Sequence, residues 1–152
     1  KLGLVPYGDI RPMKDDSPTL TFNTIGRHMS RIVRTRVTSV KSPWLALCEP
    51  GELHSVAISH GEGRFIAPKE ELERLFAAGQ VATQYVDSSG APTMNIEANP
   101  NGALCAVEGI TSPDGRVLGK MGHSERWTNG LYVNVPGRYD QKIFESGVRY
   151  FR

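Results

Sequence analysis

The amino-acid sequence predicts one domain of the α/β class that is rich in strands. Three observations support this prediction. Residues 32–39 alternate between apolar and charged side chains, as in a half-buried strand. Residues 68–79 combine an initial proline, acidic residues in the first turn and a final glycine, as in a helix. Residues 112–115, Ser-Pro-Asp-Gly, form a tight-turn signal between two further apolar runs.

Two strands are predicted in the first half of the chain. In residues 32–39, valine and threonine alternate with arginine, so one face is apolar and the other is solvated. A Ser-Pro break follows, and residues 44–47 form a short apolar turn or a single helical turn. Residues 53–60 form the second strand, which the glycines of residues 61–63 end abruptly.

A helix, a third strand and a loop come next. The acids of helix 68–79 complement the positive end of its dipole, and the glycine at its end favours termination. Residues 80–87 return as a strand. Residues 88–102 are rich in Ser, Gly, Pro and Asn, which indicates a loop.

The last third of the chain is predicted to hold two short strands and a helix. The strands, residues 104–111 and 116–121, flank the tight turn. Asp140 is a candidate cap for a last helix that runs to residue 151 and carries an apolar stripe.

Composition excludes several classes of protein. The 152 residues are 39% hydrophobic and 22% charged, which is ordinary for one soluble globular domain. The net charge of +2 is too small to indicate a nucleic-acid or anionic-membrane partner. The sequence holds no apolar run of membrane-spanning length and opens with no signal-peptide pattern. Its two cysteines give no disulfide framework, so we expect a cytoplasmic protein.

His123 and Glu125 are the main candidates for catalysis. They follow an apolar run, and residues two apart in an extended segment point the same way, into one cleft. In thiol-based acyl transfer, a histidine takes the thiol proton and later protonates the leaving amine, while a carboxylate orients the ring. The alternative is a surface histidine with a nearby glutamate, and on this spacing alone it is the commoner case.

The sequence offers no evident cysteine partner for this pair. A nucleophile on a strained strand-to-helix turn needs small residues, usually glycine, two positions to either side. Neither Cys48 nor Cys105 has a glycine at these positions. We therefore expect both cysteines to be structural and buried among apolar neighbours.

Residues 60–65, His-Gly-Glu-Gly-Arg-Phe, are a second candidate site. Glycines just past a strand allow a ligand to approach the backbone closely, and His60, Glu62 and Arg64 supply polar groups. A glycine turn with solvated charges is the commoner interpretation. His54, His60, His123 and Glu62 match no zinc spacing, so we expect no metal.

Three arginines form a third candidate site. Arg27, Arg31 and Arg34 could together hold a carboxylate or a phosphate. They could equally form a solvated face, which is the interpretation that the sequence favours.

Three segments, taken together, resemble one family. They are residues 23–33, residues 56–65, and residues 99–126, which end in Met-Gly-His-Ser-Glu-Arg. In this order they are similar to the glutaminase domain of phosphoribosylformylglycinamidine synthases, the amidotransferases of purine biosynthesis. The opening residues 1–6 and the closing residues 130–151 also resemble that domain, so the resemblance spans essentially the whole chain.

The resemblance implies a three-layer, flavodoxin-like α/β fold of the class I glutamine amidotransferases, with a Cys-His-Glu triad. His123 would be the general base and acid, and Glu125 its orienting partner. The residues that would line the glutamine pocket or the interface with the synthetase part are His60, Gly61, Glu62 and Arg64. His28-Met29 stands where many relatives have Phe-Glu, so no role is assigned to the neighbouring arginines.

The resemblance further implies that residues 1–152 are the C-terminal portion of a single glutaminase domain. Residues 1–6 resemble the end of a helix, and a sheet of these strands alone would lack helical cover on its buried faces. The family's nucleophilic cysteine and oxyanion-hole glycines would precede Lys1, so we expect this chain alone to be inactive.

The expected function is to hydrolyse glutamine. The ammonia would serve the ATP-dependent conversion of formylglycinamide ribonucleotide to its amidine. Its partners would be the upstream part of the domain and the synthetase domain of the same polypeptide, which would bind ATP and Mg²⁺. This chain itself would need no cofactor. The alternative is a non-catalytic interaction or scaffold domain that retains the fold.

Overall fold

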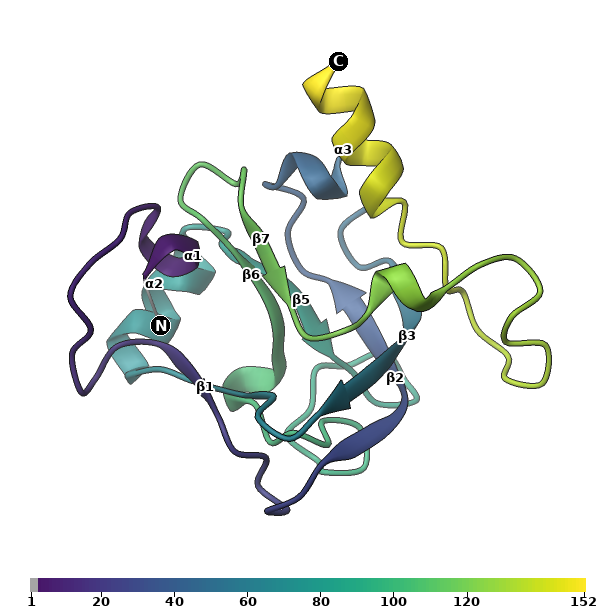
Figure 1. Cartoon of the computed structure of the whole chain (residues 1–152), viewed down its shortest axis with the longest axis horizontal. Helices are drawn as coiled ribbons and strands as arrows, with labels where there is room; N and C mark the ends of the chain where they lie inside the picture. Colours follow the sequence, from purple (N-terminus) through teal and green to yellow (C-terminus); the bar gives the residue numbers. More distant parts are fainter. Residues whose placement is uncertain (1–2) are drawn as a thin grey trace.

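A curled five-stranded sheet with the order β3-β2-β5-β6-β7 forms the centre of the structure (Figure 1). The computed structural model describes residues 3–152. All neighbouring strands in this sheet are antiparallel, and β1 and β4 form a separate antiparallel pair. The strands are β1 (Thr19–Thr21), β2 (Met29–Val37), β3 (Leu53–His60), β4 (Arg64–Ile66), β5 (Val81–Tyr85), β6 (Val107–Thr111) and β7 (Leu118–Lys120).

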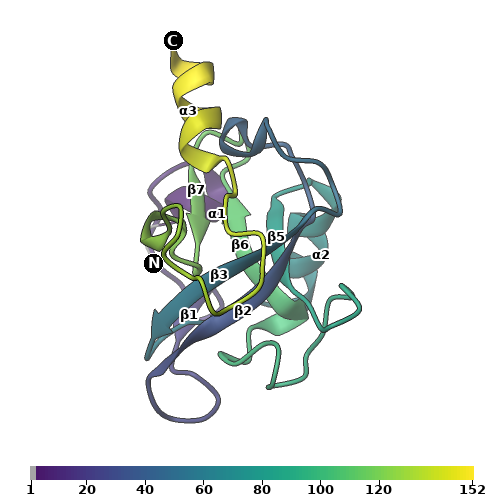
Figure 2. The ribbon, with the colours of Figure 1, turned by 90° about the vertical axis from the view of Figure 1, so that its right-hand side faces the viewer.

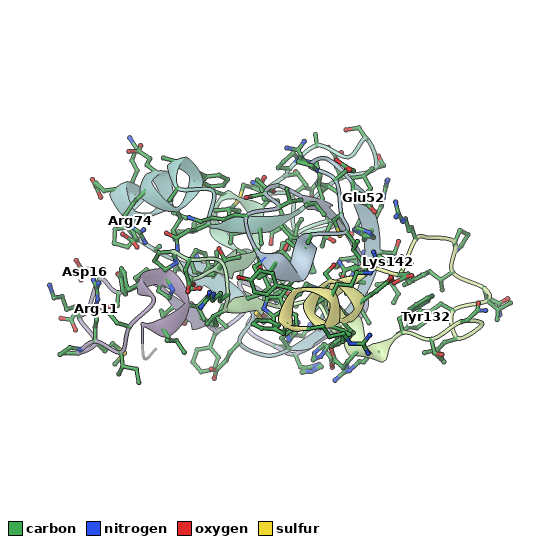
Figure 3. All side chains as sticks on the ribbon, turned by 90° about the horizontal axis from the view of Figure 1, so that it is seen from above. Arg11, Asp16, Glu52, Arg74, Tyr132 and Lys142 are labelled. Atoms are coloured by element: carbon green, nitrogen blue, oxygen red, sulfur yellow. The ribbon has the colours of Figure 1, made fainter. Side chains whose placement is uncertain are left out.

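Helices cover part of this sheet. The α-helices are α1 (Leu4–Tyr7), α2 (Lys69–Ala77) and α3 (Ile143–Phe151), and 3₁₀ turns span Pro43–Leu45, Leu104–Ala106 and Ser124–Arg126. Leu72 and Leu75 of α2 enter the main core cluster with Val33 and Tyr85 of the sheet. Ile143 joins a second, smaller cluster at the start of α3. The far end of α3 extends away from the sheet (Figures 1 and 2), and the helix is seen end-on from above (Figure 3).

The structure confirms the α/β prediction and several of its elements. Strand β3 has the bounds predicted for it, and α2 lies within the predicted helix 68–79. On β2, Val33, Thr35 and Val37 are buried, while Arg34 is exposed. The apolar-polar alternation therefore identified the buried face of this strand correctly.

Left-handed backbone conformations delay the start of two predicted elements. The strand predicted from residue 104 starts at Val107, because Cys105 and Ala106 have φ angles of 51° and 57° and form a 3₁₀ turn. The last helix starts at Ile143, because Lys142 has a left-handed φ of 57°. Asp140 Oδ1 accepts a hydrogen bond from the Lys142 nitrogen at 3.1 Å, so it caps a turn before the helix.

The N-terminal region contributes elements that the sequence analysis did not predict. Strand β1 pairs with β4, with Thr19 opposite Ile66. The helix end expected over residues 1–6 falls partly outside the described residues, and α1 spans Leu4–Tyr7. Within residues 3–152, every helix is too short or too polar to cross a bilayer.

Candidate active site

His123 lies in the loop after β7, directly before the 3₁₀ turn Ser124–Arg126. Its backbone nitrogen donates to the carbonyl oxygen of Ala57 on β3 at 2.8 Å, which ties the loop to this edge strand. The close approach requires glycine at position 122, because a Cβ there would lie 2.7 Å from the methyl groups of Val56. The residue before the histidine therefore fixes the path of this loop.

A buried ion pair between Glu108 and Lys120 supports the same loop. The Glu108 side chain is fully buried, and its Oε1 lies 3.3 Å from Lys120 Nζ. Glu108 Oε1 also accepts a hydrogen bond from the Gly122 nitrogen. Lys120 Nζ donates to the Gly122 carbonyl oxygen at 2.8 Å and to Ser124 Oγ at 3.2 Å. The pair thus holds the residues on both sides of His123.

The charge state of Glu108 follows from its surroundings. Burial acts to raise the pKa of Glu108, but the Lys120 charge and the hydrogen bonds from Thr83 and Gly122 outweigh it and lower the pKa. The carboxylate is therefore ionised at neutral pH. Glu108 was not predicted as a functional residue, although it is marked in the sequence as a lone glutamate within the apolar run 104–111.

His123 and Glu125 interact directly, as expected. Nδ1 of His123 lies 2.7 Å from Glu125 Oε1, and the two side chains are 25% and 57% exposed. The geometry is a 3₁₀ turn and not the extended segment that the spacing suggested. Partial burial opposes ionisation of Glu125, but a backbone hydrogen bond and the His123 contact lower its pKa. The carboxylate is therefore suited to orient the ring.

The second ring nitrogen of His123 is available for chemistry. Nε2 is shielded from solvent and has no hydrogen-bond partner within residues 3–152. The ring of His60 stacks on His123, with centroids 5.1 Å apart and planes inclined by 17°. Burial and the neighbouring His123 lower the pKa of His60, so its imidazole favours the neutral form.

A groove of about 660 Å³ runs along these two histidines. Lys120, Ser124 and Glu125 contribute polar groups to it, and Trp44 and Phe144 contribute apolar wall. The sequence prediction therefore identified three residues of this groove: His60, His123 and Glu125.

The other expected substrate-binding residues lie elsewhere. Gly61, Glu62 and Arg64 are not among the described residues that line this groove. Gly61 and Glu62 lie in the turn after β3, and Arg64 begins β4. This arrangement separates His60 from the rest of the predicted glycine-rich site.

Asn23 links the second and third candidate segments. Its Nδ2 donates to the His60 carbonyl oxygen at 2.7 Å, and its Oδ1 accepts from the Gly63 nitrogen at 3.0 Å. Asn23 therefore holds the glycine turn in place. The arginines of the third segment are exposed, as expected for a solvated face: Arg27, Arg31 and Arg34.

The two cysteines differ in their exposure to solvent. Cys48 is buried as expected, and burial raises the pKa of its thiol to about 11. The prediction was wrong for Cys105, which is exposed in the 3₁₀ turn before β6. The left-handed backbone there places the side chain outside the core that the apolar run suggested. Neither cysteine is among the described residues that line the groove.

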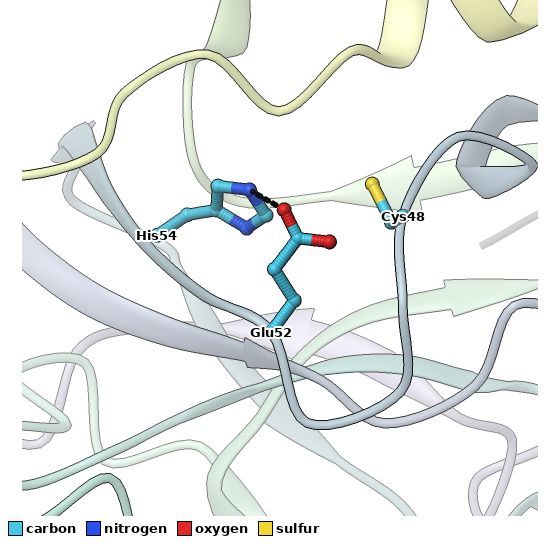
Figure 4. Close-up of side chains that lie close together, drawn as sticks. All are labelled: Cys48, Glu52 and His54. Atoms are coloured by element: carbon cyan, nitrogen blue, oxygen red, sulfur yellow. Dashed lines mark ion pairs between the residues drawn. The ribbon is translucent and has the colours of Figure 1, made fainter.

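One group of side chains within residues 3–152 has the composition and spacing of a metal site. It consists of Cys48, Glu52 and His54 (Figure 4). The set considered from the sequence, which included His60, His123 and Glu62, does not come together in this way.

Comparison with known proteins identifies the family. The model of the CobB/CobQ-like glutamine amidotransferase domain matches residues 1–151. The chain belongs to this glutamine amidotransferase family. The match covers β7, the His123 loop and α3, so the candidate site lies inside the amidotransferase domain.

Two curated relatives of this chain are each named phosphoribosylformylglycinamidine synthase subunit PurQ. The protein from Thermomicrobium roseum is 43% identical over 94 residues, which cover 62% of this chain and 39% of the relative. The protein from Symbiobacterium thermophilum is 34% identical over 148 residues, which cover 97% of this chain and 56% of the relative. The chain thus spans about half the length of the curated relatives it matches. The resemblance found in the sequence is confirmed.

A solved structure shows the same amidotransferase fold. It is the structure of PurLQS from Thermotoga maritima, which superposes with a TM-score of 0.67 over 90% of this chain and 54% of that chain. Because sequence identity is 24%, this comparison establishes the fold alone.

Proposed function

We propose that this chain supplies the general base and the orienting carboxylate of a glutaminase active site. The geometry of His123 carries the proposal. Glu125 engages Nδ1 at 2.7 Å, while Nε2 has no hydrogen-bond partner within residues 3–152. In a nucleophile-base-carboxylate triad, this second nitrogen is the one that exchanges a proton with the nucleophile. The glutamine amidotransferase family match supports a thiol as that nucleophile.

In this mechanism the thiol comes from a segment outside these 152 residues, since neither Cys48 nor Cys105 lines the groove. His123 Nε2 takes the thiol proton, and the thiolate attacks the carboxamide carbon of glutamine. The C–N bond then breaks, and His123 returns the proton to the leaving nitrogen, which departs as ammonia. Water hydrolyses the thioester, which releases glutamate and restores the thiol.

We further propose that the ammonia serves phosphoribosylformylglycinamidine synthase, as the names of the relatives suggest. The partners of the chain are then the rest of the glutaminase domain and a synthetase domain. That synthetase domain binds ATP and Mg²⁺ and converts formylglycinamide ribonucleotide to its amidine. The proposed compartment is the cytoplasm, where the free thiols of Cys48 and Cys105 stay reduced.

The deciding experiment compares two nitrogen sources in the complete enzyme. His123→Ala should lower glutamine-dependent activity by roughly 10⁴-fold or more, as loss of a triad member does. Activity with added ammonia should be unchanged, because the synthetase does not need the triad. The matched control is His28→Ala, since His28 is an exposed histidine that contacts Ser59.

The same experiment tests the scaffold alternative. If His123→Ala keeps glutamine-dependent activity near the wild-type level, the triad assignment fails and a non-catalytic role is supported. We also expect the isolated chain to release no glutamate from glutamine. Release that stops on alkylation of Cys105 would instead place the nucleophile within this chain.

A further inference from the structure

Three potential ligands lie together outside the active-site groove, where the loop after Pro43–Leu45 enters β3 (Figure 4). Cys48, Glu52 and His54 each present one ligand atom, and these atoms lie within 4.8 Å of one another. Cys48 is 5% exposed, and the side chains of Glu52 and His54 are 10% and 1% exposed. A thiol, a carboxylate and an imidazole are therefore gathered where little water reaches them.

The local fold brings these groups together over seven residues of sequence, 48–54. Gly51 has a φ of 88°, a left-handed conformation that favours glycine and turns the chain back before β3. Glu52 directly precedes β3 and His54 is the second residue of this strand, and the side chains of these two residues point to the same side. The Glu49 nitrogen donates to Glu52 Oε2 at 2.8 Å and fixes the carboxylate, which leaves Oε1 directed at His54.

Two of these atoms face one another without forming a hydrogen bond. His54 Nε2 is 3.1 Å from Glu52 Oε1 and has no hydrogen-bond partner within residues 3–152, whereas Oε1 is ion-paired with Arg138. An imidazole nitrogen that carries no proton has a lone pair with which it binds metal ions. A buried ring nitrogen without a hydrogen-bond partner is costly, and a cation bound at His54 Nε2 would satisfy it.

We propose that Cys48, Glu52 and His54 bind a divalent cation of the zinc class through sulfur, a carboxylate oxygen and Nε2. Sulfur, nitrogen and oxygen are the ligand atoms of zinc sites, and three protein ligands leave a fourth position for water. In this structure the Cys48 thiol donates a hydrogen bond to the Gln141 carbonyl oxygen at 3.1 Å. On binding, the S–H bond breaks, the proton passes to solvent and a metal–sulfur bond forms without a change in oxidation state.

Arg138 is the group that competes with the metal. Its Nη2 lies 2.5 Å from Glu52 Oε1, so the guanidinium now neutralises the carboxylate. The Arg138 side chain is 57% exposed, so it can move into solvent when a cation takes its place. Removal of Arg138 should therefore strengthen metal binding, an effect that a purely structural cluster would not show.

The test titrates the protein with Co²⁺ as a spectroscopic probe and then with Zn²⁺. We expect a sulfur-to-cobalt charge-transfer band that saturates at about one equivalent and disappears when Zn²⁺ is added. Cys48→Ser should abolish the band. His54→Gln should weaken Zn²⁺ binding by more than roughly 10-fold, because even the loss of a residue that only hydrogen-bonds to a metal ligand weakens binding by about that factor. Arg138→Gln should tighten binding. The matched control, Cys105→Ser, should leave the band unchanged.

Two results would overturn the proposal. One is the absence of a thiolate band in the wild-type protein. The other is a band that survives Cys48→Ser but is lost in Cys105→Ser. Circular dichroism checks that each variant folds, and if Cys48→Ser does not fold, His54→Gln and Arg138→Gln still decide the question. Because the readout is metal binding, its outcome is independent of glutamine hydrolysis.

Discussion

Glu108 accepts a hydrogen bond from the backbone nitrogen of Gly122, the residue directly before His123. The same carboxylate oxygen lies 3.3 Å from Lys120 Nζ, which also donates to the Gly122 carbonyl oxygen. The buried ion pair therefore forms hydrogen bonds with both the backbone N–H and the carbonyl oxygen of Gly122. Because a buried pair gains little net stability over an apolar core, its distinctive contribution here is to position the loop.

Glu108→Gln should strongly destabilise the protein. The amide leaves the buried Lys120 charge without its counter-ion, and removal of one partner of a buried pair costs about 3–5 kcal/mol. The free energy of unfolding in urea measures this loss. Glu97→Gln is the control, because Glu97 is exposed and its substitution should change stability by less than about 0.5 kcal/mol. Equal effects of the two substitutions would contradict the role of the pair.

His60→Phe should flatten the dependence of stability on pH. Burial and His123 lower the pKa of His60, so the unfolded chain binds this proton more readily than the folded chain. The free energy of unfolding should therefore fall as pH decreases through about 6.5, the ordinary value for histidine. Phenylalanine keeps an aromatic ring in the stack but does not titrate. Unfolding curves between about pH 7.5 and 5.5 measure the difference.

His28→Phe provides the comparison for this pH series. His28 is exposed and contacts Ser59, and it is only a minor cause of the lowered pKa of His60, so its substitution should change the slope less than His60→Phe does. His54, whose pKa is also lowered by burial, remains in both variants and contributes equally to both slopes. A His60→Phe slope as steep as that of wild type would show that His60 titrates normally.

The two glycines of the turn after β3 should respond differently to alanine. A Cβ at Gly63 would lie 1.6 Å from Asn101 Nδ2, and the Asn101 side chain is fully buried. Gly63→Ala should therefore cost about 1–3 kcal/mol, as overpacking does. A Cβ at Gly61 meets no described atom within 4 Å, so Gly61→Ala should be close to neutral. Denaturant unfolding of the two variants tests the contrast, which similar losses would refute.

The two cysteines should differ in their reactivity. Cys105 is exposed and should react with a thiol reagent in the folded protein. Cys48 is buried, with a thiol pKa of about 11, and should react only after unfolding. Mass spectrometry that counts modified thiols with and without denaturant measures this difference. In Cys105→Ser, the fast reaction should disappear; a fast reaction that persisted would mean that Cys48 is accessible.

Local patterns were sufficient to predict much of the fold. The strand predicted over residues 53–60 has the bounds of β3, because glycines follow it directly and end it. The left-handed conformations at Cys105 and Lys142 could not be predicted, because such backbone angles are uncommon outside glycine. Because of these conformations, β6 starts at Val107 and α3 at Ile143, later in the chain than predicted.

The site was only partly accessible to sequence reasoning. The i, i+2 spacing of His123 and Glu125 identified a real contact, although the backbone is a 3₁₀ turn. The cluster of Cys48, Glu52 and His54 was not predicted, because its sequence spacing matches no zinc pattern. The burial that makes it a candidate metal site arises only from tertiary packing.

The sequence by itself determined the α/β class, the amidotransferase family and the contact between His123 and Glu125, because each depends on local periodicity, motif order or short spacing. Only the tertiary structure decided that His60 stacks on His123 and that Glu108 and Lys120 together hold the loop that contains His123. The histidines stack because the loop after β7 is hydrogen-bonded to the edge strand β3, which joins residues more than sixty positions apart in sequence, and Glu108 meets Lys120 because β6 pairs with β7.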